Sequence, residues 1–545
     1  MAGSSSEPQA WLLSDILPSL HKPEKMLALL PVILLLLTPG VMLVIRILKP
    51  AFSYYWLVAV AGSSLAWVSA LLIGFQLPQE ILLLRWTPDI IFPASPTLLA
   101  DLTTWPYAFA LATLAMAVIL TAAARLGQYS WKTWASTLTL AGLGILAIFS
   151  GNLLTLLLSW AAIDLMELVI LLIQINDSSD RERAVISFSS RVAGIMLLLW
   201  ASLVGAPGDP FLFTDIPPGT SVYLLLAAGL RLGVLPLHLP FARELPLRRG
   251  LGSMLRLAPV ASSLMLLTRV AAAGIAQPVQ PILFALAGLA ALYGALGWLT
   301  AADELRGRPF WILGMAALAV ASAIKGHPLA SQAWGLACLL TGGLLFLSSA
   351  RYRSLLVIFI LGVLGVTGLP FTPAWDGTHL YASPFDFYLP VFLIAHAILL
   401  TGYFRHALAP SSDLSQSDRW IRAVYPLGLG ILPLSQFLLA WRTPLPTDST
   451  GNYSEWWAGV AVLSLTALMV YLGQRELRLP SSLLPIWTRA FSVNWIAGLL
   501  WAVYRSAGRI IALITRIMEG EGGVLWAMLL LVLLVSWLAQ GGLGI

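Results

Sequence analysis

Apolar stretches of about 20 residues recur along almost the whole chain, and this repetition limits the folds open to it. Of the 545 residues, 59% are hydrophobic and only 10% are charged, whereas a soluble domain carries about 25% charged residues. A helix of about 20 apolar residues crosses a bilayer and satisfies its own backbone polar groups there. The sequence therefore predicts an all-α polytopic membrane protein.

The apolar pattern predicts about sixteen spans, with boundaries open by a few residues. They are expected at residues 26–47, 55–76, 104–125, 133–150, 152–175, 185–205, 220–240, 256–275, 279–301, 309–324, 329–349, 353–371, 386–407, 422–441, 455–474 and 523–541. The polar gaps between them are too short to bury a core of their own. No soluble domain is expected.

The region 484–522 differs from the spans because arginines interrupt its apolar residues. Arg505, Arg509 and Arg516 recur at helical spacing on one face. We expect an amphipathic lateral helix on the membrane surface or on partner subunits. The alternative is one more span near 494–515.

The remaining division of the chain follows from the spans. We expect a polar segment at 1–25, N-terminal helices at 26–126, two similar halves at 127–275 and 276–410, further helices at 411–483, and a last span within 523–545.

Basic residues follow the odd-numbered spans and are scarce after the even-numbered ones. The positive-inside rule then places the odd-numbered exits in the cytoplasm and both termini outside. Residues 1–25 are polar and show no cleavage pattern, so no signal peptide is expected. The predicted location is a bacterial plasma membrane, and the net charge of +6 does not indicate a nucleic-acid partner.

The sequence lacks the motifs of cofactor and metal binding. It contains no phosphate-binding glycine loop, no nucleotide fingerprint and no paired metal-ligand spacing. The single cysteine, Cys338, excludes a disulfide framework and is expected to be a packing residue. We therefore expect no cofactor in this chain and no ATP-driven transport by it alone.

The segment GLRLGVLPLHLP, from Gly229 to Pro240, places polar groups inside a predicted span. Pro236 and Pro240 are expected to kink or break the helix. A charge such as Arg231 within a membrane usually faces a protein interior or a wet cavity. His238 titrates near neutral pH, so it is a candidate proton relay, with a packing role as the alternative.

Two acidic residues lie in the span 152–175. Asp164 and Glu167 are one helical turn apart and share a face. Intramembrane acids usually mark ion pathways, and Arg231 is a suitable partner for one of them. The alternative is that the two carboxylates only pin a neighbouring helix.

Further candidates lie along the second part of the chain. Arg256 begins the span 256–275, where it points inward or extends to the membrane surface. Pro370 and Pro373 break the span 353–371. The other candidate relay groups are Asp376, His379 and His396.

The two proline-broken spans occupy matching places in the two halves. Broken helices of this kind are typical of inverted-repeat transporters with sites near the membrane midplane. The repeat is predicted from the breaks alone.

Three pieces of sequence resemble a known family: GLRLGVLPLHLPFARELP, ALYGALGWLTAADELR and GLPFTPAW. They are similar to the proton-translocating antiporter-like membrane subunits of respiratory complex I. The same family includes multisubunit sodium/proton antiporters, membrane-bound hydrogenases and bicarbonate-uptake complexes. The similarity covers roughly residues 100–410, and the lateral helix further resembles the longest complex I subunit of this type.

The resemblance implies a horizontal polar axis, and this chain departs from it. The family pairs a glutamate with a lysine on the first broken span, where this chain has Asp164 and Arg231. Arg256 falls near the family's histidine, and residues 374–379 cover its second lysine without supplying one. Arginine is not deprotonated in proteins, so Arg231 is able to polarise Asp164 but not to carry a proton.

The sequence thus predicts an integral subunit of a multisubunit membrane complex that moves protons or sodium ions. The resemblance implies an NADH-quinone oxidoreductase-like or hydrogenase-like translocase, with other membrane subunits and a peripheral redox module as partners and no active site in this chain. Two alternatives stay open. One is a structural subunit that anchors its partners without pumping, and the other is the membrane subunit of a bicarbonate-uptake complex.

Overall fold

The architecture below is that of a computed structural model. It describes residues 27–83, 85–86, 95–175, 178–204, 213, 216–239, 249–276, 278–350, 355–382, 388–409, 418–442 and 456–474, and short pieces between 502 and 536. The chain divides into two units, residues 1–478 and 479–545, and each is described by itself.

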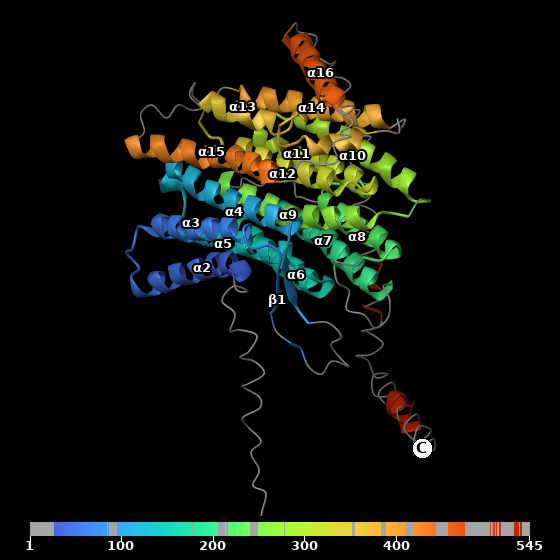
Figure 1. Ribbon diagram of the computed structural model, residues 1–545. Helices are drawn as coiled ribbons and strands as arrows, with labels where there is room; N and C mark the ends of the chain where they lie inside the picture. The colour runs from blue at the N-terminus through green and yellow to red at the C-terminus, as the bar shows by residue number, and fades with distance from the viewer. Residues whose placement is uncertain are drawn as a thin grey trace, which may run out of the picture. The chain divides into compact units, whose positions relative to one another are not determined.

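The first unit is a bundle of α-helices (Figure 1). They are α2 (Leu30–Leu48), α3 (Tyr55–Ile73), α4 (Thr104–Thr121), α5 (Trp131–Ile148), α6 (Leu153–Gln174), α7 (Ser178–Val204), α8 (Pro218–Leu232), α9 (Arg249–Ala273), α10 (Gln280–Thr300), α11 (Glu304–Ile324), α12 (Pro328–Leu347), α13 (Leu356–Leu364), α14 (Leu389–Ala407), α15 (Arg419–Arg442) and α16 (Trp456–Gln474). Short 3₁₀ helices are η2 (Ala122–Gln128) and η4 (Asp376–Tyr381).

Each predicted span from 26–47 to 455–474 overlaps one of these helices, which confirms the all-α polytopic architecture. Among the described residues, twelve helices are long and apolar enough to cross a membrane. The expected number is higher by four because α8 and α13 end early, α5 has a polar first half, and most of the expected span 523–541 lies outside the described residues. This chain is therefore a multi-pass membrane protein.

The expected span 523–541 and most of the lateral helix at 484–522 lie outside the described residues. Arg505 and Arg509 are helical where the structure describes them, and Arg516 is among the residues that it leaves undescribed.

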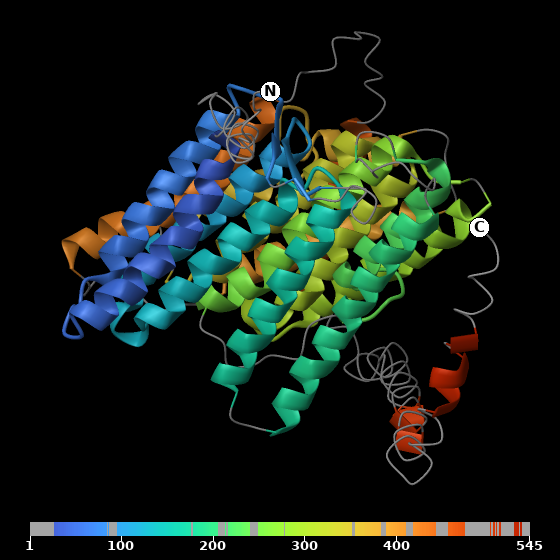
Figure 2. The ribbon, with the colours of Figure 1, turned by 90° about the horizontal axis from the view of Figure 1, so that it is seen from below.

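One small sheet interrupts the helical pattern. Strand β1 (Gln79–Leu82) pairs antiparallel with β2 (Thr97–Ala100), with Gln79 opposite Ala100. The hairpin lies at one end of the bundle, beside the start of α6 (Figure 2). A bridge between Leu98 and Ser150 ties it to that start, so the hairpin fixes where α6 begins.

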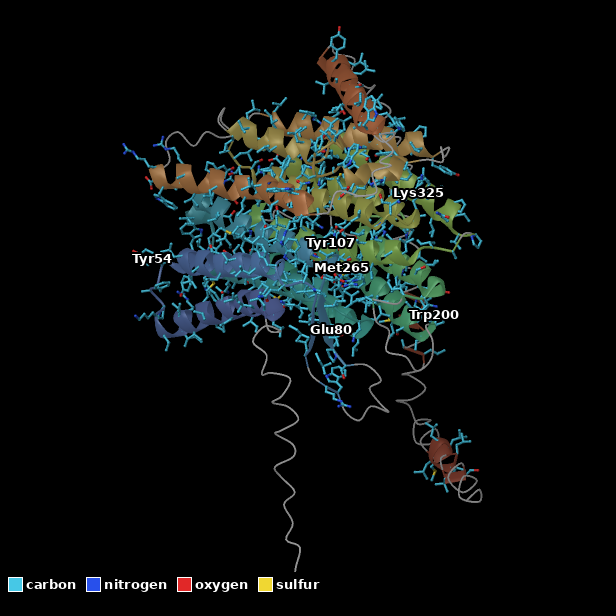
Figure 3. The ribbon with its side chains drawn as sticks, viewed as in Figure 1. Tyr54, Glu80, Tyr107, Trp200, Met265 and Lys325 are labelled. Carbon is cyan, nitrogen blue, oxygen red and sulfur yellow. The ribbon has the colours of Figure 1, made fainter. Side chains whose placement is uncertain are left out.

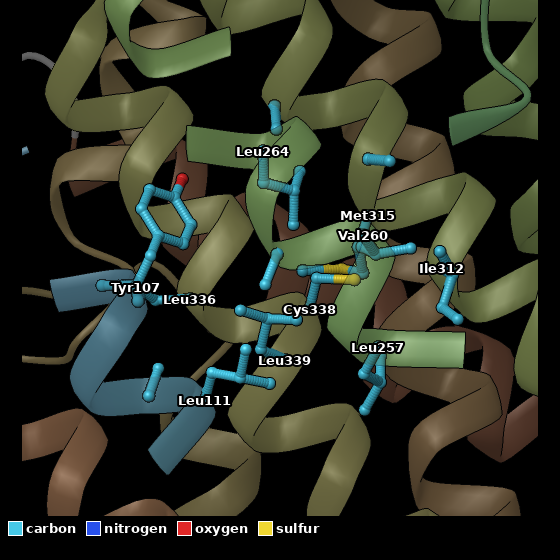
Figure 4. Packing of buried hydrophobic residues seen from close by; sticks show 14 of the residues in the cluster. Tyr107, Leu111, Leu257, Val260, Leu264, Ile312, Met315, Leu336, Cys338 and Leu339 are labelled. Atoms are coloured by element: carbon cyan, nitrogen blue, oxygen red, sulfur yellow. The ribbon is translucent and has the colours of Figure 1, made fainter. Parts of the chain in front are cut away.

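Four helices form the centre of the bundle, namely α4, α9, α11 and α12, and almost all of their residues are buried. Apolar side chains of all four meet there (Figure 4). By contrast, α2, α3 and α16 expose rows of large apolar side chains, as a lipid-facing surface requires. Figure 3 shows the contrast between Tyr107 and Met265 in the interior and Tyr54 and Trp200 at the periphery.

The close crossing of α10 and α11 allows a direct test of this packing. A Cβ atom added at Gly294 would lie 2.5 Å from the backbone nitrogen of Gly314. Because backbone atoms have no room to give, we expect Gly294→Ala to lower stability by about 1–3 kcal/mol. The matched control is Gly40→Ala on α2, where nothing lies within 4 Å of the added atom. Thermal unfolding in detergent measures both, and equal midpoints for the two variants would contradict the crossing.

Candidate functional site

Helix α6 carries the two predicted carboxylates near the middle of its length. Asn152 caps its first turn, because its side-chain oxygen accepts the backbone N–H of Thr155 at 2.9 Å. Asp164 and Glu167 follow on one face and are 1% and 3% exposed. The cap and the helical repeat therefore place both acids deep inside the bundle.

Helix α8 ends at Leu232, before the prolines of its segment. Gly233 adopts a left-handed conformation, with φ +80°, and its N–H bonds back to the carbonyl of Gly229. Glycine is the residue that accepts this conformation without steric cost. Pro236 then lies in the following turns, and Pro240 lies outside the described residues. The helix thus stops just after Arg231, which occupies its last turn.

Arg231 and Asp164 form a two-pronged ion pair between α8 and α6. Arg231 donates from Nη1 to Asp164 Oδ2 at 2.5 Å and from Nη2 to Oδ1 at 2.7 Å. Both side chains are 1% exposed. This fork geometry is the strongest form of charge-assisted hydrogen bond between side chains. The two groups meet in the protein interior, away from the lipid-facing surface.

Neighbouring residues hold Arg231 in place. Its guanidinium lies over the Trp160 ring, 4.2 Å from Cζ to the centroid, in a cation–π contact. Trp160 is itself fixed, because its indole N–H donates to Ser262 of α9 at 2.9 Å. Gly194 of α7 leaves room for the methylenes of Arg231, since a Cβ there would lie 2.8 Å from Arg231 Cγ.

A second arginine, Arg191 near the middle of α7, completes the site. It donates from Nη2 to Glu167 Oε1 at 2.7 Å, and its Nη1 contacts Glu167 Oε2. The same Nη1 lies 3.8 Å from Asp164 Oδ1. Sequence reasoning missed this residue, although an arginine inside an apolar stretch was the signal that could have found it.

The four side chains, which we call the arginine–carboxylate cluster, are Asp164, Glu167, Arg191 and Arg231. Two cations and two anions balance, so the cluster is neutral by formal charge. Both arginines keep their protons, so only the carboxylates are able to accept one. Chemically, the cluster is able to bind a cation, or release one, by opening an ion pair.

The other candidates of the first half lie outside these ion pairs. His238 bonds locally, with its Nδ1 2.8 Å from the carbonyl oxygen of Pro236. Its Nε2 is buried and has no hydrogen-bond partner among the described residues. Arg256 is buried on α9 and is 7% exposed, so it points into the protein rather than to the membrane surface.

A neutral polar region lies at the helix break that follows α13. Helix α13 ends at Leu364, and the turns that follow contain Pro370 and Pro373. His396 of α14 is fully buried, with Nε2 2.7 Å from the carbonyl of Val366 and Nδ1 3.2 Å from the hydroxyl of Tyr381. The two histidine nitrogens thus bind protein groups on either side of the break.

Asp376 and His379 lie on η4, beside that region, and both are partly exposed. The His379 ring lies 6.3 Å from the ring of His327. Lys325 donates to the carbonyl of Leu380 at 3.4 Å. These groups gather where α11 ends and α12 begins.

Helices α9, α11 and α12 lie between the arginine–carboxylate cluster and the second polar region, since α8 packs on α9 and η4 packs on α12. Their facing side chains are mainly apolar (Figure 4), and they include Leu257, Val260, Ile312, Met315 and Leu339. The structure therefore places the sequence candidates in two separate groups.

The balance of charge in the cluster predicts that removing one charge lowers stability more than removing an ion pair as a whole. Removing one partner of a buried ion pair leaves the other uncompensated, so we expect Asp164→Leu to cost about 3–5 kcal/mol. The double variant Asp164→Leu with Arg231→Met removes both charges and should recover most of that loss. Thermal unfolding of the purified complex measures the difference. A double variant no more stable than Asp164→Leu alone would contradict the pairing.

Comparison with known proteins gives likenesses of fold only. The sequence matches no protein-family model and no curated protein. A chain of the membrane-bound sulfane sulfur reductase, an archaeal respiratory membrane complex, matches with a TM-score of 0.64 and 14% identity, over 93% of this chain and 99% of that chain. A chain of respiratory complex I from Thermus thermophilus, with bound aureothin, matches with a TM-score of 0.56 and 17% identity, over 75% and 97%.

A chain of the Mrp complex from Dietzia sp. matches with a TM-score of 0.67 and 15% identity, over 95% of this chain. This chain spans 63% of the length of that Mrp chain. The likenesses agree with the resemblance read from the sequence. This protein therefore shares its fold with chains of these three membrane complexes.

Proposed function

We propose that this chain is an ion-translocating membrane subunit of a multisubunit complex of the complex I-like type. It moves protons or sodium ions, coupled to redox chemistry or ion exchange in its partners. The observation that carries the proposal is the ion pair of Asp164 and Arg231, buried near the middle of α6 and at the broken end of α8.

The energetics of buried charge favour this function. A buried ion pair stabilises a protein little more than apolar side chains of similar volume, because desolvation offsets its attraction. Four charged side chains in the interior of a membrane bundle therefore add little net stability. Charged groups at such positions are typical of ion pathways.

In this proposal each group of the cluster has a definite role. Asp164 and Glu167 are the oxygen ligands that accept the ion. Arg231 and Arg191 are fixed positive charges that release a carboxylate when the ion arrives. Opening and closing of the ion pair between Asp164 and Arg231 then controls the passage of the ion.

We extend the proposal to the remaining sequence candidates as groups that relay ions to and from the membrane surfaces. His238 lies directly after the break of α8, and its Nε2 faces the protein interior. His396 connects through Tyr381 to η4, which carries His379 and Asp376. Arg256 would act as another fixed charge.

A structural, non-pumping subunit is the second candidate. The observation that favours it is that each carboxylate is already held by two nitrogens of an arginine, in a cluster with no lysine. A cluster closed in this way is able to hold α6, α7 and α8 together without moving an ion.

Replacing the central carboxylate separates these two functions. We expect Asp164→Asn to abolish ion translocation while the complex still assembles, because the amide keeps the shape but loses the charge that pairs with Arg231. The measurement is ion uptake by proteoliposomes that contain the purified complex. The matched control is Asp418→Asn, an exposed residue just before α15, which should leave uptake unchanged. Full activity in an assembled Asp164→Asn complex would favour the structural role.

The partners are part of the proposal. We propose other membrane subunits, together with a peripheral redox module, in the plasma membrane of a bacterium with both termini outside. Purification of the tagged chain in mild detergent, followed by mass spectrometry, should recover a hydrogenase-like or quinone-reductase-like module. Recovery of a large soluble zinc protein in its place would favour a bicarbonate-uptake complex.

A further inference from the structure

Arg191 contacts both carboxylates of the cluster. Its Nη2 donates to Glu167 at 2.7 Å, and its Nη1 lies 3.8 Å from Asp164 Oδ1. Asp164 therefore has two guanidinium neighbours, one hydrogen-bonded and one about an ångström too far for an ordinary charge-assisted hydrogen bond of about 2.7–2.9 Å.

We propose that Arg191 is a positioning residue that transmits the charge of Glu167 to the ion pair of Asp164 and Arg231. This inference rests on the proposed function, because it names the group that receives the proton. In this inference, Glu167 takes up the proton, and Arg191 then moves from Glu167 to Asp164.

The protonation state of Glu167 determines which arginine binds Asp164. While Glu167 is ionised, it holds Arg191, and Asp164 is bound by Arg231 alone. When a proton binds a carboxylate oxygen of Glu167, that residue loses its negative charge and its hold on Arg191. Arg191 then closes the 3.8 Å gap and shares Asp164 with Arg231. The proton adds one positive charge to the cluster, and no group is left as an unpaired anion.

The surroundings allow this exchange without unfolding the site. Arg231 keeps its contact with Trp160 when its hold on Asp164 weakens, because the ring lies on the face of the guanidinium. Gly194 lies one turn after Arg191 on α7, on the same face, and gives the stem of Arg231 its space.

Other charged groups on the neighbouring helices are few. Helices α5, α7 and α9 pack against α6. Besides Arg191, the described side chains of α5 and α7 that bear charge are Lys132, in the first turn of α5, and Arg181, in the first turn of α7. Helix α9 carries Arg249, Arg256 and Arg269. Arg191 forms an ion pair with Glu167.

The substitution Glu167→Gln imitates the protonated acid and tests the inference directly. In a cryo-EM structure of the assembled complex, we expect Asp164 to lie within hydrogen-bonding distance of Arg191, with its contact to Arg231 lengthened. Adding Arg191→Gln to Glu167→Gln should return Asp164 to Arg231 alone. The matched control Glu80→Gln, on the exposed side of β1, should leave the cluster unchanged.

The pH dependence of ion uptake by proteoliposomes is a second test, because a purely structural role of Glu167 would leave it unchanged. We expect Glu167→Gln to lose the pH dependence of uptake that the parent complex shows, while Glu80→Gln keeps it. An unchanged cluster geometry in Glu167→Gln, or an unchanged pH dependence, overturns the role of Arg191. If the parent complex does not translocate ions, the proposed function fails, and the cryo-EM geometry still decides whether Arg191 exchanges partners.

Discussion

The ion pair between Asp164 and Arg231 is the interaction on which the rest of the site depends. In an interior lined by apolar side chains, each charge is costly to bury without the other. The requirement to bring them together explains why α8 stops where it does, why α7 has a glycine beside the arginine stem, and why Trp160 lies beneath the guanidinium. Glu167, one helical turn after Asp164 on α6, is compensated in the same way by Arg191.

The buried polar groups at the two helix breaks find their partners in two chemically different ways. At the end of α8 the chain presents an arginine to a carboxylate, so full charges compensate each other. Beyond α13 the backbone carbonyl of Val366 contacts His396, and that of Gly365 accepts a hydrogen bond from Gln436 of α15 at 2.9 Å. Neutral donors suffice there because only backbone dipoles need partners. The two helix breaks thus differ in the chemistry that satisfies them.

Sequence reasoning went furthest where hydrophobicity alone decides the structure. Span positions followed from apolar length, and the pairing of Asp164 with Arg231 followed from their types and from the family resemblance. Arg191 was missed because it lies in a stretch that reads as an ordinary span. The stop of α8 was assigned to prolines, whereas Gly233 ends the helix, and this needs backbone angles. The partners of His396 lie 15 and 30 residues earlier in the chain, across a helix break, which no helical repeat reveals.

The place of Arg231 in the last turn of α8 has a consequence for the sign of the local field. The final carbonyls of a helix carry a partial negative charge of about half an elementary charge, and Arg231 lies in the turn that bears them. The backbone thus tips a formally neutral site toward negative potential. Such a site draws in cations and repels anions, even before any carboxylate changes its state.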